Sequence, residues 1–307
     1  MRQLAESAHA VADGAVLTES VTGSMSSPTE WRGEFRYAYE LIGEPLNLLA
    51  GGQRWFRKVL GCEYSPRPDA RALVLGAIPW LTRSMCEMVA HTTVVDTSAA
   101  MLAMCQSWVR PLALPASNAA AFVRANWLSL PESLQGLDLV VSDNSFSFLS
   151  YPDHWDELVD VLGRRMTDGS VLFARVLSVP ASHRRLCPAE IVSRALSGRA
   201  PVNLTAVRAA LLFAHWDERD WIIRPEDALA TFETHRRDFD PVLCGTRDGA
   251  ANDLLSIEKY RGAGATYFVP PLAEAIQRFG RRFHVRAVYF GPYELSQYFP
   301  LIVASRD

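Results

Sequence analysis

The stretches "ALVLGAIPWL" (72–81) and "TTVVDTSAAML" (92–102) decide the fold of this chain. Each begins with a short run of apolar or β-branched residues and continues into a segment typical of a helix. Strands that are apolar on both faces and alternate with helices indicate a parallel sheet covered on both sides. Because crossovers in such sheets are almost always right-handed, a doubly wound sheet is the simplest topology.

The same alternation continues toward the C-terminus. Short apolar runs predict three further strands, within 120–131, 137–149 and 170–178, and the spacing of apolar residues in 151–169 predicts an amphipathic helix. The last stretch, 284–305, predicts a strand, a polar connection and another strand. Such an ending fits an antiparallel pair that closes a mostly parallel sheet.

Composition limits the class of protein. Of the 307 residues, 49% are apolar, which suffices for a large core, and the net charge of −3 argues against a nucleic-acid partner. No apolar run is long enough to span a bilayer, and the N-terminus lacks the pattern of a signal peptide. We therefore expect a cytoplasmic protein with no membrane partner.

The cysteines are scattered, odd in number and without a C-x-x-C pair, which argues against a zinc site and against a disulfide framework. We expect no metal site and reduced, mostly buried thiols. The cysteines are Cys62, Cys86, Cys105, Cys187 and Cys244.

The N-terminal part differs in composition from the rest. Residues 1–28 are small and polar and predict a flexible arm. Residues 29–66 have helical spacing of apolar side chains, and we expect Pro45 and the pair Gly51-Gly52 to divide them into two or three helices.

The predicted core comprises 67–180 and 283–307, and the intervening residues 181–282 read as consecutive helices without strands. We expect this helical segment to cover a substrate site, because an aromatic-lined cavity suits a small organic molecule. The alternative is that its aromatic residues form the core of the segment itself. These residues are Phe213, Trp216, Trp221, Phe232 and Tyr260.

In open α/β sheets the ligand lies outside the carboxyl ends of the strands. After the first strand, Gly76 has no Cβ and lets the backbone approach a ligand closely, although a glycine there is ordinarily just a turn. Pro79 removes one N–H, and the stretch lacks the Lys-Ser/Thr of a P-loop. The first turn is therefore not a phosphate cradle.

The second strand ends at Asp96, whose carboxylate could accept two hydrogen bonds from the 2′ and 3′ hydroxyls of a ribose. The alternative is that Asp96 caps the following helix, a role that Thr97 or Ser98 could take instead.

Polar residues also follow the third and fourth strands. Asn126 and Trp127 could contact the edge and face of an adenine, or be an ordinary loop residue beside a core indole. Asp143, Asn144 and Ser145 follow the fourth strand, where helix capping would need one of them.

Together these four stretches and the C-terminal hairpin resemble the class I S-adenosylmethionine (SAM)-dependent methyltransferases, over about residues 70–180 and 283–307. The resemblance implies a Rossmann-like sheet with a helical lid and SAM as the cofactor. It implies that SAM's methionine portion lies against Gly76, its ribose at Asp96 with Thr97 and Met101 nearby, its adenine between Asn126 and Trp127, and its sulfonium end at Asn144 and Ser145. Ala77 and Asp143 are further expected cofactor-binding residues. Two departures concern the methionine and adenine ends, because the family's first motif has more glycines and its third loop usually has Asp where this chain has Asn126.

We expect a methyltransferase that acts on a small organic molecule, and the resemblance implies a role in secondary metabolism. One alternative is an enzyme that cyclises SAM to azetidine-2-carboxylate and releases methylthioadenosine, and another is a SAM-fold protein without catalysis. His154, Tyr151 and His183 are candidate bases, although capping or contact with water is the more ordinary role for His154. The catalytic residues, the acceptor and the oligomeric state stay unassigned.

Overall fold

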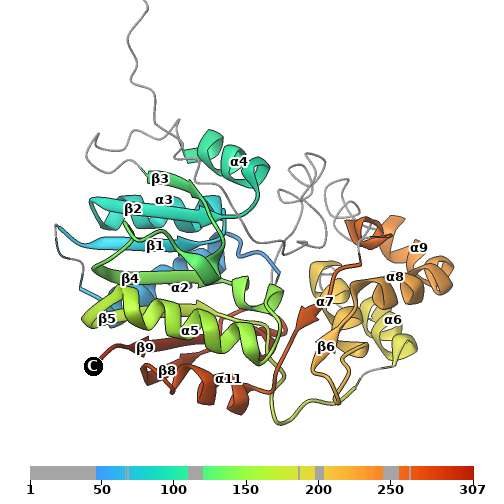
Figure 1. Ribbon diagram of the computed structural model, residues 1–307. Coiled ribbons are helices and arrows are strands. Elements are labelled where there is room, and N and C mark those ends of the chain that lie inside the picture. The colour runs from blue at the N-terminus through green and yellow to red at the C-terminus, as the bar shows by residue number, and fades with distance from the viewer. Residues whose placement is uncertain are drawn as a thin grey trace, which may run out of the picture.

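A seven-stranded sheet forms the centre of the molecule. The computed structural model describes residues 46–65, 67, 69–109, 120–185, 187–197, 204–244, 256–262 and 264–307. The strands lie in the order β3-β2-β1-β4-β5-β9-β8 (Figure 1). They are β1 (Arg71–Leu75), β2 (His91–Asp96), β3 (Ala120–Arg124), β4 (Leu137–Asp143), β5 (Met166–Arg175), β8 (His284–Tyr289) and β9 (Leu301–Ser305).

The pairing confirms the mostly parallel sheet with a C-terminal antiparallel hairpin. Strands β1 to β5 pair in parallel, so their carboxyl ends meet at one edge. Strand β9 enters between β5 and β8 and is antiparallel to both. We refer below to the edge that carries the ends of β1 to β5 as the carboxyl edge.

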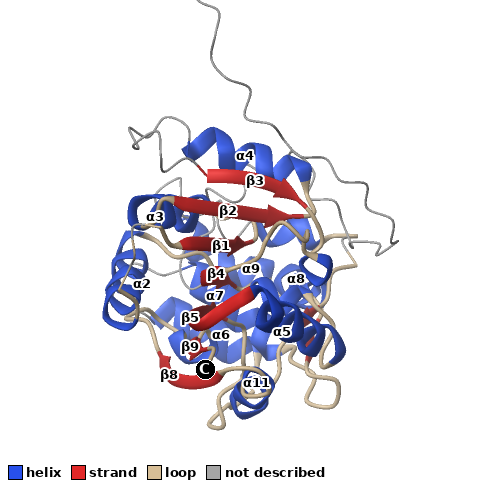
Figure 2. Ribbon diagram, turned by 60° about the vertical axis from the view of Figure 1, so that its left-hand side comes forward, coloured by secondary structure: helices blue, strands red, loops and turns tan. Residues whose placement is uncertain are grey.

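Helices cover both faces of the sheet (Figure 2). On one face lie α2 (Ala50–Glu63), α3 (Pro79–Met88) and α4 (Ala99–Val109), and on the other lie α5 (Asp153–Arg165) and α11 (Leu272–Phe279). Phe56 of the first group packs on Trp80 and Phe173, and on the opposite face Phe146 packs on Trp155 and Phe279. These two apolar layers enclose β1, β4 and β5, the strands whose ends carry most of the candidate site.

A second body of helices lies beyond the carboxyl edge (Figure 1). It contains α6 (Pro188–Ser197), α7 (Leu204–Ala214), α8 (Pro225–Thr234) and α9 (Arg236–Cys244), with a two-stranded ribbon of β6 (Ile222–Ile223) and β7 (Tyr267–Phe268). Its predicted aromatic residues pack in two places: Phe232 packs on Phe239 within the body, whereas Phe213 packs on Tyr298 and Phe299, which lie just before β9. Four short 3₁₀ helices complete the described elements: η2 (Trp127–Ser129), η3 (Ser145–Phe148), η4 (Ser256–Tyr260) and η5 (Ser296–Tyr298).

Three expectations need correction. The pair Gly51-Gly52 does not interrupt a helix, because α2 begins at Ala50 and carries both glycines in its first turn, where backbone strain is small. The segment 181–282 is not free of strands, since it contains the ribbon of β6 and β7. Its last helix, α11, packs on the sheet through Ala275 and Phe279 and so belongs with the core.

The expected arm (1–28) and residues 29–45 of the expected N-terminal helices lie outside the described residues. In the described part of the chain, no helix has the length and apolar character needed to cross a membrane.

The packing of α11 predicts the effect of truncating Phe279. Its side chain is fully buried against Phe146 and Trp155, so Phe279→Ala should lower the free energy of unfolding by about 3–5 kcal/mol. Urea unfolding measures the change, and Gln277→Ala, an exposed position on the same helix, is the control with no measurable loss expected. Equal stability of the two variants would contradict the assignment of α11 to the core.

Candidate functional site

The backbone N–H groups of the turn after β1 are engaged in hydrogen bonds within the protein. Pro79, the first residue of α3, has no N–H to offer. The other three N–H groups of the turn donate within the protein: Gly76 to the carbonyl of Val95 at 2.9 Å, Ala77 to Oδ2 of Asp96 at 3.0 Å, and Ile78 to the carbonyl of Gly76 at 3.0 Å. The turn therefore offers no backbone donor to a phosphate, as predicted.

Gly76 is required at this turn for two reasons. Its φ of 93° lies in the left-handed region that favours glycine. A Cβ would also lie 3.3 Å from Oγ of Ser145 and 3.7 Å from Cζ2 of Trp127. Three predicted residues therefore come together here: Gly76 after β1, Trp127 at the start of η2 and Ser145 at the start of η3.

Asp96 joins the turn after β1 to the turn after β2 through hydrogen bonds. One carboxylate oxygen accepts from the N–H of Ala77, and the other accepts from the N–H of Ser98 at 2.8 Å. The hydroxyl of Ser98 accepts from the N–H of Met101 at 3.3 Å, so Ser98, and not Asp96, caps α4. A carboxylate has about four acceptor sites, so Asp96 keeps capacity for further hydrogen bonds.

Burial raises the pKa of Asp96, and the N–H groups of Ser98, Ala77 and Thr97 oppose that rise. The residue nevertheless keeps part of its surface accessible.

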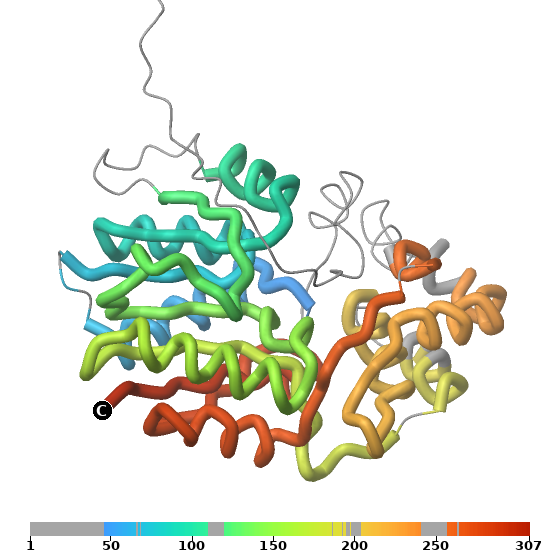
Figure 3. The backbone as a smooth tube through the Cα atoms, viewed as in Figure 1, coloured from blue at the N-terminus to red at the C-terminus, as the bar shows by residue number. Residues whose placement is uncertain are grey.

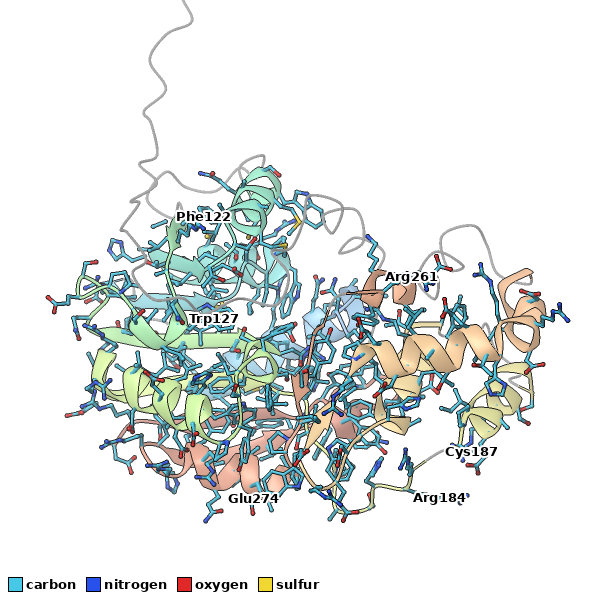
Figure 4. The ribbon with its side chains drawn as sticks, turned by 45° about the vertical axis from the view of Figure 1, so that its right-hand side comes forward. Phe122, Trp127, Arg184, Cys187, Arg261 and Glu274 are labelled. Atoms are coloured by element: carbon cyan, nitrogen blue, oxygen red, sulfur yellow. The ribbon has the colours of Figure 1, made fainter. Side chains whose placement is uncertain are left out.

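Trp127 lies across the end of β2. Its Nε1 donates to the carbonyl of Val95 at 2.8 Å, which fixes the indole beneath the first turn. Oδ1 of Asn126 accepts from the N–H of Leu128 at 3.0 Å and caps η2, so this oxygen takes the ordinary loop role. Figure 4 places Trp127 in the sheet part of the molecule, apart from Arg261 and Cys187 on the helical body.

The other two residues expected at the ribose, Thr97 and Met101, lie at the start of α4. Thr97 is exposed, and its carbonyl accepts from Nε of Arg124 at 3.0 Å. Met101 is buried in the first turn of α4.

The end of β4 carries a polar group that its surroundings leave unsatisfied. Asn144 has a φ of 63°, and its Nδ2 donates to the carbonyl of Leu46 at 3.3 Å. Its Oδ1 is buried and accepts no hydrogen bond from the described residues. Ser145 donates to the carbonyl of Leu75 at 2.7 Å, which joins η3 to the end of β1.

Arg175, at the end of β5, is a site residue that the sequence analysis missed. Its side chain is fully buried, and Nε donates to Oδ1 of Asp143 at 2.6 Å. Other contacts join it to the hydroxyl of Tyr293 and the carbonyl of Leu46, both at 3.3 Å, and to the ring of Phe299 at 5.4 Å. The signal was present, because Arg175 is the one charged residue in the apolar stretch 170–180.

The pair of Asp143 and Arg175 is ionised. Burial lowers the pKa of Arg175, but the carboxylate of Asp143 and the hydroxyl of Tyr293 together outweigh this effect and raise that pKa above its usual range. Burial also raises the pKa of Asp143. We assign the charged form to Asp143 because it contacts a guanidinium that keeps its proton at neutral pH.

The three candidate bases form no hydrogen bond with one another among the described residues. The hydroxyl of Tyr151 accepts from Nε of Arg278 at 3.0 Å, between α5 and α11. His154 lies in the first turn of α5, and its Nδ1 is buried without a hydrogen-bond partner among the described residues. His183 bonds the hydroxyl of Tyr298 through Nδ1 at 3.0 Å, and burial lowers its pKa. None of these contacts identifies a base.

Within the described ranges, no group of three or more His, Cys, Asp or Glu side chains is arranged to hold a metal ion. The cysteines described, Cys62, Cys86, Cys105 and Cys187, carry free thiols.

Comparison with known proteins identifies the fold. No protein-family model matches the sequence, and a search of curated proteins gives no match. The chain is similar to a protein described as a Zn-dependent alcohol dehydrogenase from Rhodobacter sphaeroides, with a TM-score of 0.55, 12% identity, and coverage of 93% of this chain and 100% of the other. It is also similar to a SAM-dependent methyltransferase from Methanosarcina mazei, with a TM-score of 0.51, 12% identity, and coverage of 85% and 99%.

At sequence identities this low, the similarity shows the fold and not the activity, and the two proteins indeed carry different names. The Rossmann-like fold expected from the resemblance is confirmed.

The buried ion pair predicts a contrast between two Asp→Asn substitutions. Asp143→Asn leaves the guanidinium of Arg175 buried without its counter-charge and should lower the free energy of unfolding by about 3–5 kcal/mol. Asp160→Asn removes a solvent-exposed pair with Arg282 and should cost little. Chemical denaturation measures both, and equal losses would contradict the role assigned to the buried pair.

Proposed function

We propose that this protein is a SAM-dependent methyltransferase that acts on a small organic molecule in the cytoplasm. The observation that carries the proposal is the carboxylate of Asp96, held at the end of β2 beside the glycine turn of β1. A carboxylate at this position of a Rossmann-like sheet suits a ribose diol and disfavours a phosphate. The strand order β3-β2-β1-β4-β5-β9-β8, with its antiparallel β9, supports the same family of folds.

The residues present fit SAM. The remaining acceptor capacity of Asp96 suits the two ribose hydroxyls, and the fixed indole of Trp127 offers a flat apolar surface to the adenine. The buried, unsatisfied Oδ1 of Asn144 suits an ammonium donor such as that of the methionine portion. The absence of a Cβ at Gly76 lets the side chains of Ser145 and Trp127 pack close to the first turn.

When bound, SAM supplies an electrophilic methyl group on a cationic sulfur. The protein has to hold the acceptor atom in line with that methyl group and to exclude water from the site. Asp96, Asn144 and Ser145 orient one reactant, while the helical body beyond the carboxyl edge covers the other. The chemistry requires no covalent residue, and we assign no base.

A second candidate is the cyclisation of SAM to azetidine-2-carboxylate. There the amine attacks the γ-carbon, the C–S bond breaks, methylthioadenosine leaves and the amine loses a proton. Two observations favour keeping this candidate: the first turn has no spare backbone donor for the methionine portion, and the acceptor of Asn144 could orient the amine.

Incubation with SAM separates the candidates. Methylthioadenosine formed from SAM alone supports cyclisation, whereas S-adenosylhomocysteine formed only when an acceptor is added supports methyl transfer. Chromatography with mass detection resolves these products. A calorimetric titration that detects no SAM binding would support the third candidate, a binding protein without catalysis.

Replacing Asp96, the residue proposed to bind the ribose, should weaken SAM binding. Asp96→Asn removes the charge from up to two hydrogen bonds and should raise the Kd for SAM by about 10- to 100-fold, since a hydrogen bond to a charged group contributes roughly 1.5–3 kcal/mol. Calorimetry measures the Kd, and urea unfolding verifies that the variant folds. Asp168→Asn, an 81% exposed side chain at the start of β5, is the control. An unchanged Kd in Asp96→Asn would refute the assignment.

SAM affinity should also depend on pH through Asp96. Burial raises the pKa of this carboxyl above its usual 3.8, so the carboxylate form is lost at a higher pH than in an exposed aspartate. Binding should therefore be full above the raised pKa and fall as the pH drops through it. Titrations at a series of acidic pH values test this, and Asp96→Asn should remove that pH dependence.

A further inference from the structure

Tyr293 lies where the sheet part of the molecule meets the helical body. It belongs to the connection between β8 and β9, and its side chain packs on the apolar clusters of both parts. Its ring meets that of Trp55 in α2 edge-on, with centroids 6.0 Å apart. The chain crosses from the end of β5 to the helical body (Figure 3), and Arg175 is the last residue of β5. Tyr293 and Arg175 therefore both lie at the boundary between the two parts.

The ring of Tyr293 packs directly on the backbone of Gly291. Gly291 is buried, and a Cβ added to it would overlap that ring. Only a residue without a side chain allows this close approach. With the ring in this place, the hydroxyl of Tyr293 accepts a hydrogen bond from Nη1 of Arg175 at 3.3 Å.

The hydroxyl of Tyr293 helps to set the plane of the guanidinium of Arg175. Each guanidinium nitrogen has a different partner: Nε donates to Asp143, Nη1 to Tyr293 and Nη2 to the carbonyl of Leu46. The ion pair at Nε would by itself leave rotation about the Cδ–Nε bond open, and the contact at Nη1 restricts that rotation. Because the group is planar and rigid, the contact at Nη1 also sets the direction of Nη2.

The carbonyl of Leu46 is shared between this guanidinium and Asn144. It accepts from Nη2 of Arg175 and from Nδ2 of Asn144, both at 3.3 Å. In a carboxamide the oxygen and the nitrogen are bonded to one carbon, so holding Nδ2 also fixes the direction of Oδ1. That oxygen is buried without a partner among the described residues and is the acceptor proposed above for the ammonium group of SAM. Tyr293 is thus linked to the proposed ammonium site through Arg175 and Leu46.

We propose that Tyr293 is a positioning residue for the methionine portion of SAM, because it holds Arg175 and through it the carboxamide of Asn144. The inference rests on the proposed function, and it applies to both proposed reactions, since SAM is a substrate of each. Its effect is confined to the methionine portion. Asp96 and Trp127, proposed for the ribose and the adenine, are held by backbone groups of β2 and of the turns after β1 and β2.

S-adenosylhomocysteine and methylthioadenosine are the probes, because they share the adenosine and the sulfur and differ in the aminocarboxypropyl chain. Calorimetry on the full chain should give a Kd for S-adenosylhomocysteine about tenfold or more below that for methylthioadenosine. Tyr293→Phe keeps the ring and removes the hydroxyl, so it should reduce this ratio of Kd values about three- to tenfold and leave the Kd for methylthioadenosine unchanged. Gly291→Ala, which displaces the ring, should change the ratio in the same direction. The control is Tyr289→Phe, whose hydroxyl bonds Glu63 at the end of α2 and should alter neither Kd.

A double-mutant cycle separates positioning from a merely structural role. Asn144→Gly tolerates the φ of 63° and removes the carboxamide, so it should lower the ratio about tenfold or more. Tyr293→Phe added to Asn144→Gly should change the ratio no further, since no carboxamide is left to position. Urea unfolding verifies that each variant folds, and the ratio in Tyr293→Phe decides alone if Asn144→Gly does not.

Four results would overturn the inference: equal affinities of the unaltered protein for the two probes, an unchanged ratio in Tyr293→Phe, an equal loss of both ligands in that variant, or its full effect in the Asn144→Gly background. Each of them leaves the proposed function standing, because the unaltered protein would still bind S-adenosylhomocysteine. An unaltered protein that binds neither probe would sink the proposed function, and the inference with it.

Discussion

The guanidinium of Arg175 joins three segments that are far apart in the sequence. It binds Asp143 at the end of β4, Tyr293 in the connection between β8 and β9, and the carbonyl of Leu46 ahead of α2. Its own carbonyl accepts from the N–H of Asn144 at 2.7 Å, and Nδ2 of Asn144 reaches the same Leu46 carbonyl. Asn144, whose Oδ1 is unsatisfied, is therefore held by the backbone of Arg175 and by a carbonyl that the guanidinium also contacts.

The carboxyl edge is fixed largely by its own hydrogen bonds. Asp96 engages the N–H groups of both Ala77 and Ser98, and Ser145 engages the carbonyl of Leu75, so these turns are held before any ligand arrives. Preorganisation of this kind lowers the entropic cost of binding. It also means that the first turn offers a ligand no backbone donor. That restriction bears most on the methionine portion of the proposed ligand, SAM, and is why both proposed reactions stay open.

The sequence predicted the number of strands in the main sheet and their succession along the chain, because most of them are short apolar runs that alternate with helices. It also predicted which residues follow their ends. It could not predict β6 and β7, since two residues are too few to show a period of two. It misjudged Gly51-Gly52, because glycine tolerated in a first turn looks the same as glycine that breaks a helix. It missed Arg175 as a site residue, because one charged residue in an apolar stretch does not reveal its partners, which come from distant segments.

The 3₁₀ helix η3 links the two halves of the proposed reaction. At its start, Ser145 is bonded to the end of β1, and at its end Phe148 packs on Tyr267 of the helical body. A 3₁₀ helix rises about 2 Å per residue, so these two residues are separated by roughly 6 Å along its axis. The short helix therefore joins the turn after β1 to the helical body, so a shift of Tyr267 would act on Ser145 through only three residues.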